Sequence, residues 1–352
     1  MARATDSYAA QRDRAYTLRT RQLLKELPPF CEEFFMGIAD RTSALTRYEY
    51  AVDLRIFFKY LASVRDDGKG LSPADYTIED LGAVTLDDLE RYFSYVTLYE
   101  DDDGNPVKNH ERAKARKVAS LRSLFKYFYK KQKIKSNPAS LLDTPKLHEK
   151  PIIRLEANEV ADLLDLVDSG TALSDRERAF HKKTRRRDAA ILTLFLGTGI
   201  RVSELVGLNV DDFDFSINGF KVTRKGGSQV ILYFSDEVAE VVLDYLQERN
   251  AVTPLPGHEK ALFLSLQKKR MTVRAVENLV KKYCSSAVPL KKITPHKLRS
   301  TYGTMLYQET GDIYVVADVL GHKDVNTTRK HYAAQTDERR RQAARVVRLR
   351  ED

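Results

Sequence analysis

Apolar residues recur at helical spacing along most of this chain and alternate with polar residues in only one region. The helical pattern is clearest at 109–132, where Leu121, Leu124, Phe125 and Phe128 stand at positions i, i+3, i+4 and i+7. The same spacing predicts three earlier helices, at residues 28–38, 43–60 and 85–99. The first half of the chain is therefore predicted to fold as a four-helix bundle.

The second half combines further helices with the alternating region. Apolar and polar residues alternate at 213–215, 220–224 and 229–234, which predicts three short antiparallel strands. Helices are predicted at residues 156–167, 189–196, 235–249, 272–284, 295 onward and 312–321. The predicted fold class is mainly α, with a four-helix bundle followed by a mostly helical domain that contains a small three-stranded antiparallel sheet.

The chain length and a proline-bearing segment divide the sequence into two domains. A length of 352 residues suits two domains of ordinary size. Residues 144–152 are polar and interrupted by proline, which is typical of a linker. Residues 1–27 are predicted to form an N-terminal arm, either helical or loose, and residues 337–352 a basic helical tail. The two domains then span residues 28–143 and 153–336.

Composition indicates which kind of partner and which cellular compartment to expect. The net charge is +9 and the pI about 9.2, which moderately favours a polyanionic partner. Cys31 and Cys284 match no metal-ligand spacing, so we expect reduced thiols in a cytoplasmic protein. No apolar run reaches the roughly 18 residues of a membrane span, and the N-terminus has no signal-peptide pattern. We therefore expect no membrane partner.

An arginine follows directly after an apolar helix and a glycine-containing break. The run 189–196 ends at a Gly-Thr-Gly sequence, and Arg201 stands where the next helix begins. A guanidinium in such surroundings is costly to desolvate unless an anion meets it. Helix N-termini also attract phosphate through their unpaired N–H groups. Two interpretations stay open at this point: a phosphate site, or an arginine paired with Glu204 or Asp188.

Four short motifs occur in order along the second half. They are Gly-Thr-Gly-Ile-Arg-Val-Ser-Glu-Leu around Arg201, a Gly-Gly turn after Lys225, Thr-Pro-His-Lys-Leu-Arg with His296 and Arg299, and Leu-Gly-His ending at His322, with Tyr332 ten residues later. This set resembles the tyrosine recombinase (phage-type integrase) family over about residues 28–350. The organisation is most similar to the Xer-type site-specific recombinases.

The resemblance implies an enzyme that cuts and rejoins DNA by transesterification. Tyr332 would attack a DNA phosphorus, form a 3′-phosphotyrosyl intermediate and release a 5′-hydroxyl. Arg201 and Arg299 would bind the non-bridging oxygens, where negative charge grows in the transition state. Guanidinium groups suit this task because they stay charged at every relevant pH.

The remaining motif residues are implied to move protons and to orient the site. Lys225 would protonate the leaving 5′-oxygen, and His296 would accept the tyrosine proton. His322 would hydrogen-bond the phosphate, and Glu204 would orient Arg201. The set contains no metal-ligand cluster, so the resemblance implies catalysis with no metal and no cofactor.

The sequence departs from the Xer pattern at two positions. In Xer proteins the tyrosine lies nine residues after the histidine equivalent to His322, whereas Tyr332 lies ten residues after it, a spacing that other integrases show. Ser300 follows Arg299 where the family often has histidine. These departures weaken a close placement among Xer proteins but leave the expected activity intact.

The family closes a core DNA-binding helical domain and a catalytic domain around DNA, which implies these roles for residues 28–143 and 153–336. Candidate DNA contacts lie on the helices 109–132 and 272–284, and most would meet phosphate rather than bases. A basic face that meets only solvent is the alternative for the first of these helices. The candidates are Arg112, Arg116, Lys117, Arg122, Arg274 and Lys281.

The tail at 337–352 resembles a segment that family members dock onto a neighbouring subunit. This implies a tetramer on two DNA sites with paired half-sites, either of one chain or together with a paralogous recombinase. A tail folded on its own domain is the alternative.

The predicted function is a site-specific DNA recombinase that resolves chromosome dimers or integrates and excises a mobile element. A type IB topoisomerase-like relaxing enzyme and a non-catalytic DNA-binding relic are the alternative functions.

Overall fold

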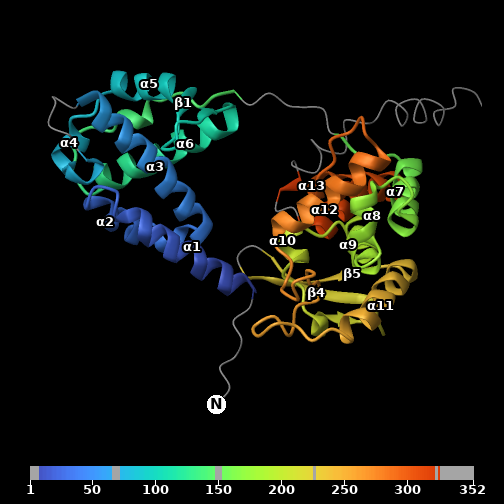
Figure 1. Cartoon of the computed structure of the whole chain (residues 1–352). Helices are drawn as coiled ribbons and strands as arrows, with labels where there is room; N and C mark the ends of the chain where they lie inside the picture. The colour runs from blue at the N-terminus through green and yellow to red at the C-terminus, as the bar shows by residue number, and fades with distance from the viewer. Residues whose placement is uncertain (1–7, 66–71, 147–152, 225–226, 322–323, 326–352) are drawn as a thin grey trace, which may run out of the picture. The chain divides into compact units, whose positions relative to one another are not determined.

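The computed structural model describes residues 8–65, 72–146, 153–224, 227–321 and 324–325. The chain divides into two compact units, Met1–Glu149 and Lys150–Asp352. Each unit buries its own set of apolar side chains, so each is described separately (Figure 1).

Unit 1 is a helical bundle around an aromatic core. Phe34, Phe57, Phe58, Phe125 and Phe128 are fully buried, and neighbouring rings meet edge to face, as in the Phe57–Phe58 pair with centroids 5.2 Å apart. The α-helices are α1 (Tyr8–Leu24), α2 (Phe30–Gly37), α3 (Ala44–Arg65), α4 (Ile78–Gly82), α5 (Leu86–Tyr95) and α6 (Glu111–Lys130). The 3-10 turns are Ala39–Arg41, Pro73–Asp75 and Pro138–Ser140.

Capping boxes determine where α4 and α5 begin. The Thr85 hydroxyl accepts a hydrogen bond from the Asp88 N–H at 3.2 Å, and the Asp88 carboxylate accepts one from the Thr85 N–H at 2.9 Å. Thr77 and Asp80 repeat this arrangement at the start of α4. Each box satisfies backbone donors that would otherwise be unpaired, which is worth about 1 kcal/mol per cap.

Two features of unit 1 were not specified by the sequence pattern. The described part of the segment predicted as an arm is a regular helix, α1, which packs on α3 with the Tyr16 and Tyr48 rings 5.5 Å apart. Strands β1 (Leu98–Glu100) and β2 (Pro106–Lys108) form a hairpin in the region between the predicted helices 85–99 and 109–132. Three-residue strands are too short for an alternating pattern to be recognised.

The central helix of unit 2 is α9 (Arg185–Thr198). Every residue from Asp188 to Leu196 is buried, which agrees with the expectation that a helix apolar on all sides lies inside a domain. It packs against helices α7, α11 and α13. The helices of unit 2 are α7 (Ala157–Ser169), α8 (Asp175–His181), α9, α10 (Val202–Leu205), α11 (Asp236–Asn250), α12 (Val273–Ala287), α13 (Pro295–Thr310) and α14 (Ile313–Leu320), with a 3-10 turn at Val210–Asp212.

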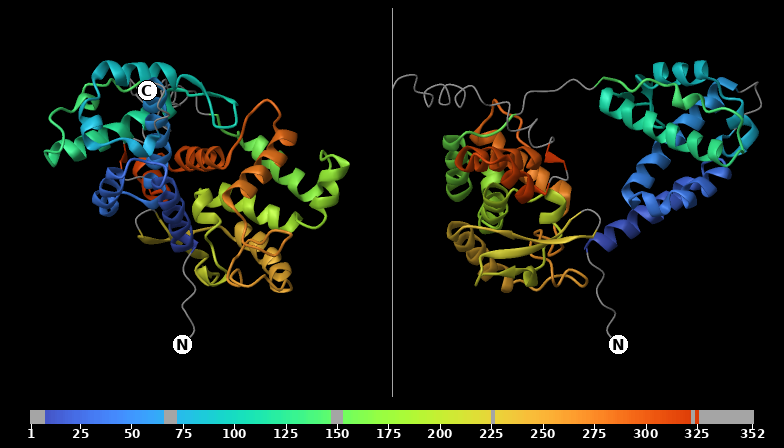
Figure 2. Two further views of the ribbon diagram at one scale, coloured as in Figure 1. Left: turned by 60° about the vertical axis from the view of Figure 1, so that its left-hand side comes forward. Right: turned by 180° about the vertical axis from the view of Figure 1, so that it is seen from behind.

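A small antiparallel sheet completes unit 2, in the order β3 (Phe213–Asp214), β4 (Gly219–Thr223) and β5 (Gln229–Tyr233). Phe220 pairs with Phe213 on one side and with Leu232 on the other. The strands lie in the lower part of unit 2 and helices α12 and α13 in the upper part, as Figures 1 and 2 show. The predicted fold class, mainly α with a small three-stranded sheet, is confirmed. No described helix is long and apolar enough to cross a membrane.

Candidate active site

The end of α9 and the start of α10 place Arg201 at a sharp turn. Gly199 ends α9 in the left-handed region, with a φ of 60°. A side chain at this position would also collide with Tyr302, whose ring lies 2.5 Å from an ideal Cβ. The backbone then becomes extended at Arg201, with φ −76° and ψ 146°, and α10 begins at the next residue. Glycine is therefore required here both by the backbone angle and by the close packing.

Glu204 is the carboxylate that holds Arg201. One Arg201 guanidinium nitrogen donates to Glu204 Oε1 at 2.8 Å, and the Arg201 backbone N–H donates to Oε2 at 3.1 Å. Glu204 is buried, with 9% of its surface exposed, whereas the Arg201 side chain is 36% exposed. Of the two carboxylates that the sequence offered for Arg201, the structure places Glu204 beside it.

Asp188 belongs to a different cluster. Its carboxylate accepts hydrogen bonds from Arg187 at 2.7 Å, from Lys282 at 3.2 Å and from the Tyr283 hydroxyl at 2.9 Å. Burial, together with the negative charge of Asp188, raises the pKa of Tyr283 well above its ordinary value. This cluster joins α9 to α12.

The C-terminal end of α14 brings Arg201 and Arg299 together. Arg201 donates to the carbonyl oxygens of Leu320 and Gly321, at 3.2 and 3.1 Å. Arg299, which is only 5% exposed, donates to the same Leu320 carbonyl and to the carbonyl of Gly199. Carbonyls at a helix C-terminus are the negative end of the helix dipole and attract cations. Two guanidinium groups from distant parts of the chain therefore converge on one carbonyl.

Backbone carbonyls contribute much of the support of these two arginines. Glu204 supplies one negative charge for Arg201, whereas the contacts of the two guanidinium groups with Leu320, Gly321 and Gly199 are with neutral carbonyls. Carbonyl oxygens orient a guanidinium without cancelling its charge. These carbonyl contacts therefore leave the guanidinium charge in place beside a partly exposed arginine, which suits an anion such as phosphate.

A third guanidinium, that of Arg224, lies at the same helix end. It was not among the site residues predicted from the sequence. Arg224 directly follows β4 and donates to the Val319 carbonyl at 3.1 Å. Burial lowers the pKa of Arg224, and nearby Arg201 lowers it further while Glu204 acts in the opposite direction. The one sequence signal for this residue was its position immediately before Lys225 in a predicted hairpin.

The other predicted site residues are only partly within the described structure. His296 is exposed on the first turn of α13, one turn before Arg299, and its carbonyl accepts a hydrogen bond from the Ser300 hydroxyl at 3.1 Å. Lys225, His322 and Tyr332 lie outside the described residues. Among the other tyrosines near this site, Tyr302 has a pKa raised by burial, which disfavours its phenolate as a nucleophile.

The candidate DNA contacts on α6 separate into three kinds. Lys117 is only 2% exposed and lies 2.9 Å from Asp53, so its ammonium neutralises a buried carboxylate and has little exposed surface for the DNA contact expected from the sequence. Arg116 shares Asp53 at 2.9 Å but stays partly exposed. Arg122 donates to the carbonyls of Ala139 and Leu142 and so holds the chain that follows α6. Arg112 is exposed on the first turn of α6.

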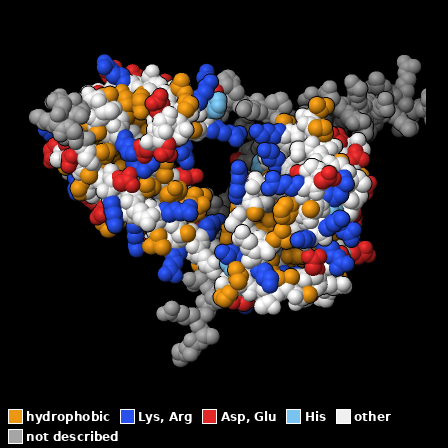
Figure 3. Space-filling model, viewed as in Figure 1, with side chains coloured by type: hydrophobic (Ala, Val, Ile, Leu, Met, Phe, Trp, Pro, Cys, Tyr) orange, Lys and Arg blue, Asp and Glu red, His pale blue; other side chains and the backbone are white. Residues whose placement is uncertain are grey.

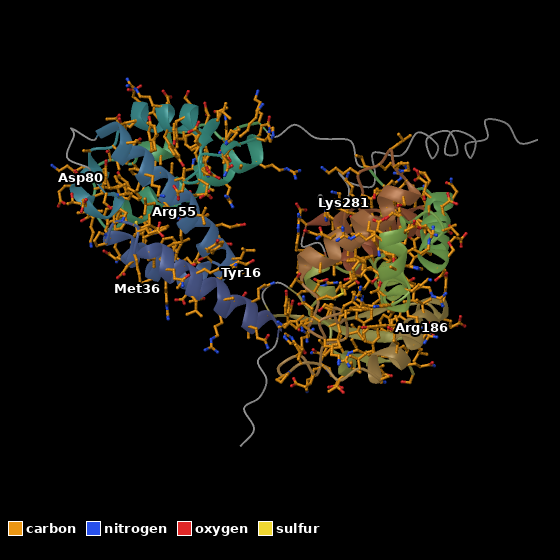
Figure 4. The ribbon with its side chains drawn as sticks, viewed as in Figure 1. Tyr16, Met36, Arg55, Asp80, Arg186 and Lys281 are labelled. Carbon is orange, nitrogen blue, oxygen red and sulfur yellow. The ribbon has the colours of Figure 1, made fainter. Side chains whose placement is uncertain are left out.

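The candidates on α12 point outward. Arg274 has an 81% exposed side chain, 3.5 Å from Glu277, and Lys281 is exposed seven residues later. Lys281 is labelled on unit 2 in Figure 4, together with Arg186 of α9. Basic side chains gather on the upper part of unit 2 as it is seen in Figure 3. These two residues are therefore available to a polyanion.

Comparisons with known proteins identify the family to which this site belongs. The phage integrase family matches residues 154–339, which include all four motifs. The chain is 36% identical to the tyrosine recombinase XerC of Caldanaerobacter subterraneus subsp. tengcongensis, over 90% of this chain and 87% of that protein. This chain belongs to the phage integrase family. The predicted resemblance to Xer-type tyrosine recombinases is confirmed.

Further relatives and solved structures support the assignment. The XerC of Syntrophus aciditrophicus is 33% identical over 62% of this chain and 68% of its own length. Among solved structures, the fold is similar to XerH bound to a difH substrate, with a TM-score of 0.65 and 20% identity over 88% of this chain and 82% of that one. The Tn1549 integrase in complex with DNA gives a TM-score of 0.63 at 22% identity, over 90% and 99% of the two chains.

Proposed function

We propose that this tyrosine recombinase cuts and rejoins DNA at specific sites, with Tyr332 as its nucleophile and Arg201 and Arg299 as the phosphate clamp. The observation that supports the clamp is the convergence of both guanidinium groups on the Leu320 carbonyl, with Glu204 as the carboxylate bound to Arg201. In this arrangement two fixed positive charges meet the non-bridging oxygens as negative charge grows there.

The reaction is a displacement at phosphorus. The Tyr332 oxygen forms a bond to phosphorus while the bond to the 5′-oxygen breaks, so a 3′-phosphotyrosyl enzyme and a free 5′-hydroxyl result. His296 takes the phenol proton, Lys225 donates a proton to the leaving oxygen, and His322 hydrogen-bonds the phosphate. Attack of a 5′-hydroxyl from a second DNA strand on the phosphotyrosyl bond reverses these steps and completes the exchange. No bond energy is lost, so no high-energy cofactor is required.

The partners follow from this chemistry. Exchange between two duplexes requires paired half-sites and four protomers on two DNA sites. The four protomers are four copies of this chain, or two copies of this chain and two of a paralogue. We assign DNA binding to Arg112, Arg116, Arg274 and Lys281, which are exposed or partly exposed. The tail at 337–352 is proposed to contact a neighbouring subunit, and the enzyme is proposed to act in the cytoplasm. XerH bound to difH is a solved example of a related fold on such a substrate.

Trapping of the covalent intermediate tests this proposal directly. Full-length protein is incubated with duplex DNA that contains its recombination site and a nick near the cleavage position, and protein–DNA adducts are separated under denaturing conditions. Wild-type protein is expected to give an adduct, and Tyr332→Phe none, because the nucleophilic oxygen is absent. Tyr302→Phe is the matched control, since Tyr302 belongs to the same unit and packs against Gly199 near the clamp.

The outcomes separate the possible functions. An adduct that survives in Tyr332→Phe would overturn the assignment of the nucleophile. DNA binding without an adduct in the wild type would favour a non-catalytic DNA-binding protein. Cleavage and relaxation of plasmids that lack a recombination site would favour a topoisomerase.

A further inference from the structure

Arg224 links the β4–β5 hairpin to the end of α14. Its backbone closes the base of the hairpin: the N–H donates to the Ser228 carbonyl at 2.8 Å, and its carbonyl accepts from Gly227 at 3.0 Å. The side chain leaves the hairpin and donates to the Val319 carbonyl at 3.1 Å. One residue thus connects two segments that lie 95 positions apart in the chain.

The contact depends on a glycine at the end of the helix. Gly321 has a φ of +62°, and an ideal Cβ at this position would lie 1.9 Å from one Arg224 guanidinium nitrogen and 2.2 Å from its central carbon. The guanidinium therefore lies directly against the Gly321 backbone. Any other residue would have to displace Arg224 and adopt an unfavourable backbone angle as well.

The position of Arg224 is unfavourable for stability taken alone. Burial lowers the pKa of its guanidinium, and its Nε atom is buried with no hydrogen-bond partner in the described structure. A buried donor without a partner costs free energy that a smaller apolar residue would avoid. The benefit that offsets this cost is expected in the function of the neighbouring groups.

Three consecutive carbonyls at the end of α14 hold three arginines. Arg224 binds Val319, Arg201 and Arg299 share Leu320, and Arg201 also binds Gly321. These carbonyls are the common support of the two clamp arginines. A shift of the helix end moves both guanidinium groups, and a misplacement of about 1 Å can reduce a rate on the order of 10²-fold.

We propose that Arg224 is a positioning residue for the phosphate clamp: by binding Val319 and packing on Gly321, it fixes the helix end that orients Arg201 and Arg299. This inference rests on the proposed recombinase function and adds to it a residue outside the proposed catalytic set. It acts through the carbonyl groups of Leu320 and Gly321.

The test compares Arg224→Ala with Arg249→Ala. Arg249 is the matched control because it is a buried arginine of the same unit, its pKa is likewise lowered by burial, and it donates to the backbone carbonyls of Ala261 and Glu259. Single-turnover adduct formation is measured on a normal site and on one with a phosphorothioate at the scissile position. Sulfur is larger than oxygen and accepts hydrogen bonds poorly, so the rate ratio reports how closely the clamp holds the non-bridging atoms.

We expect Arg224→Ala to slow adduct formation about 10- to 100-fold on normal DNA, as a misplaced clamp would. We also expect a smaller ratio of the rate on normal DNA to the rate on phosphorothioate DNA. The decrease should occur with the same phosphorothioate stereoisomer whose rate ratio Arg201→Ala changes. Arg249→Ala loses buried hydrogen bonds and is expected to be less stable than the wild type, but its rate ratio is expected to be unchanged. Arg224→Lys, which keeps a donor for Val319, is expected to recover part of the rate, and it provides the comparison if Arg224→Ala does not fold.

The results distinguish this inference from the function on which it rests. A wild-type protein that forms no Tyr332-dependent adduct contradicts the proposed function itself. The positioning role alone is contradicted if the wild type forms the adduct but the Arg224 variants behave like the wild type or like Arg249→Ala, either in rate or in rate ratio.

Discussion

Buried charge is held in different ways in the two units. In unit 1, the fully buried carboxylate of Asp53 meets Lys117 and Arg116, each at 2.9 Å, and Arg116 also lies 3.6 Å from Glu49. Two cations and two carboxylates therefore balance. In unit 2, Glu204 pairs with Arg201, and backbone carbonyls at the end of α14 hold Arg201, Arg224 and Arg299.

The difference indicates which cluster supports folding and which can bind a ligand. A balanced cluster with a buried ammonium has no positive charge to offer a DNA phosphate, although its sequence is basic. Carbonyl groups orient guanidinium side chains without neutralising them, so contacts of this kind suit an anion site better than contacts with carboxylates. The basic sequence of α6 is therefore a weaker reason to expect a DNA contact than the backbone carbonyls that orient Arg201 and Arg299.

The largest effect on stability is expected from Asp53→Ala. The change leaves the Lys117 ammonium buried without its carboxylate, and breaking a buried pair in this way costs about 3–5 kcal/mol. Urea unfolding followed by circular dichroism measures the loss. Asp102→Ala is the control: Asp102 also pairs with a lysine, at 2.6 Å, but its side chain is 59% exposed, so its loss should cost less than about 1 kcal/mol. Equal losses for the two variants would show that burial of the Asp53 pair does not increase its contribution to stability.

Arg201→Ala is expected to change rate more than stability. Loss of one preorganised donor to the developing charge lowers the rate about 10²–10³-fold, which single-turnover adduct formation measures. The fold should lose less than in Asp53→Ala, because Glu204 keeps its hydrogen bond from the backbone N–H of residue 201. Arg186→Ala is the control, since Arg186 is a partly exposed arginine paired with Asp244 on the same unit. A normal rate in Arg201→Ala would contradict the clamp.

The smallest effect is expected from the exposed pair network at the end of α6. Hydrogen bonds from Lys133 and Lys131 hold the pKa of Glu33 below its ordinary value of 4.5. A lowered folded-state pKa stabilises the protein above the ordinary value, and this contribution disappears as the pH falls through the folded-state pKa.

Glu33→Gln should therefore cost less than about 1 kcal/mol at pH 7, and its difference from wild type should shrink from about pH 5 downward. Unfolding midpoints measured across this range test the sign, with Glu90→Gln on the exposed surface of α5 as the control. A difference that grows on acidification would show that Glu33 is destabilised by its surroundings.

Much of the architecture and of the candidate site followed from the sequence by itself. Helical spacing located α6 and alternation located the three strands of unit 2, because local periodicity reflects which face of an element is buried, and a continuous apolar run located the buried helix α9. The motifs around Arg201 and Arg299 predicted the family, which the comparisons confirm. Short elements such as β1 and β2 were missed because three residues carry too little pattern.

Only the tertiary structure decided which charged side chains are available and which are used inside the protein. Lys117 and Arg112 are equally basic in the sequence, but a carboxylate 64 residues away makes Lys117 part of the core. Arg224 belongs to no motif, and its proposed role follows only from its contacts with Val319 and Gly321 in the folded chain. The physical reason is that the cost of a charge depends on its solvation and partners, which long-range packing sets and local sequence does not.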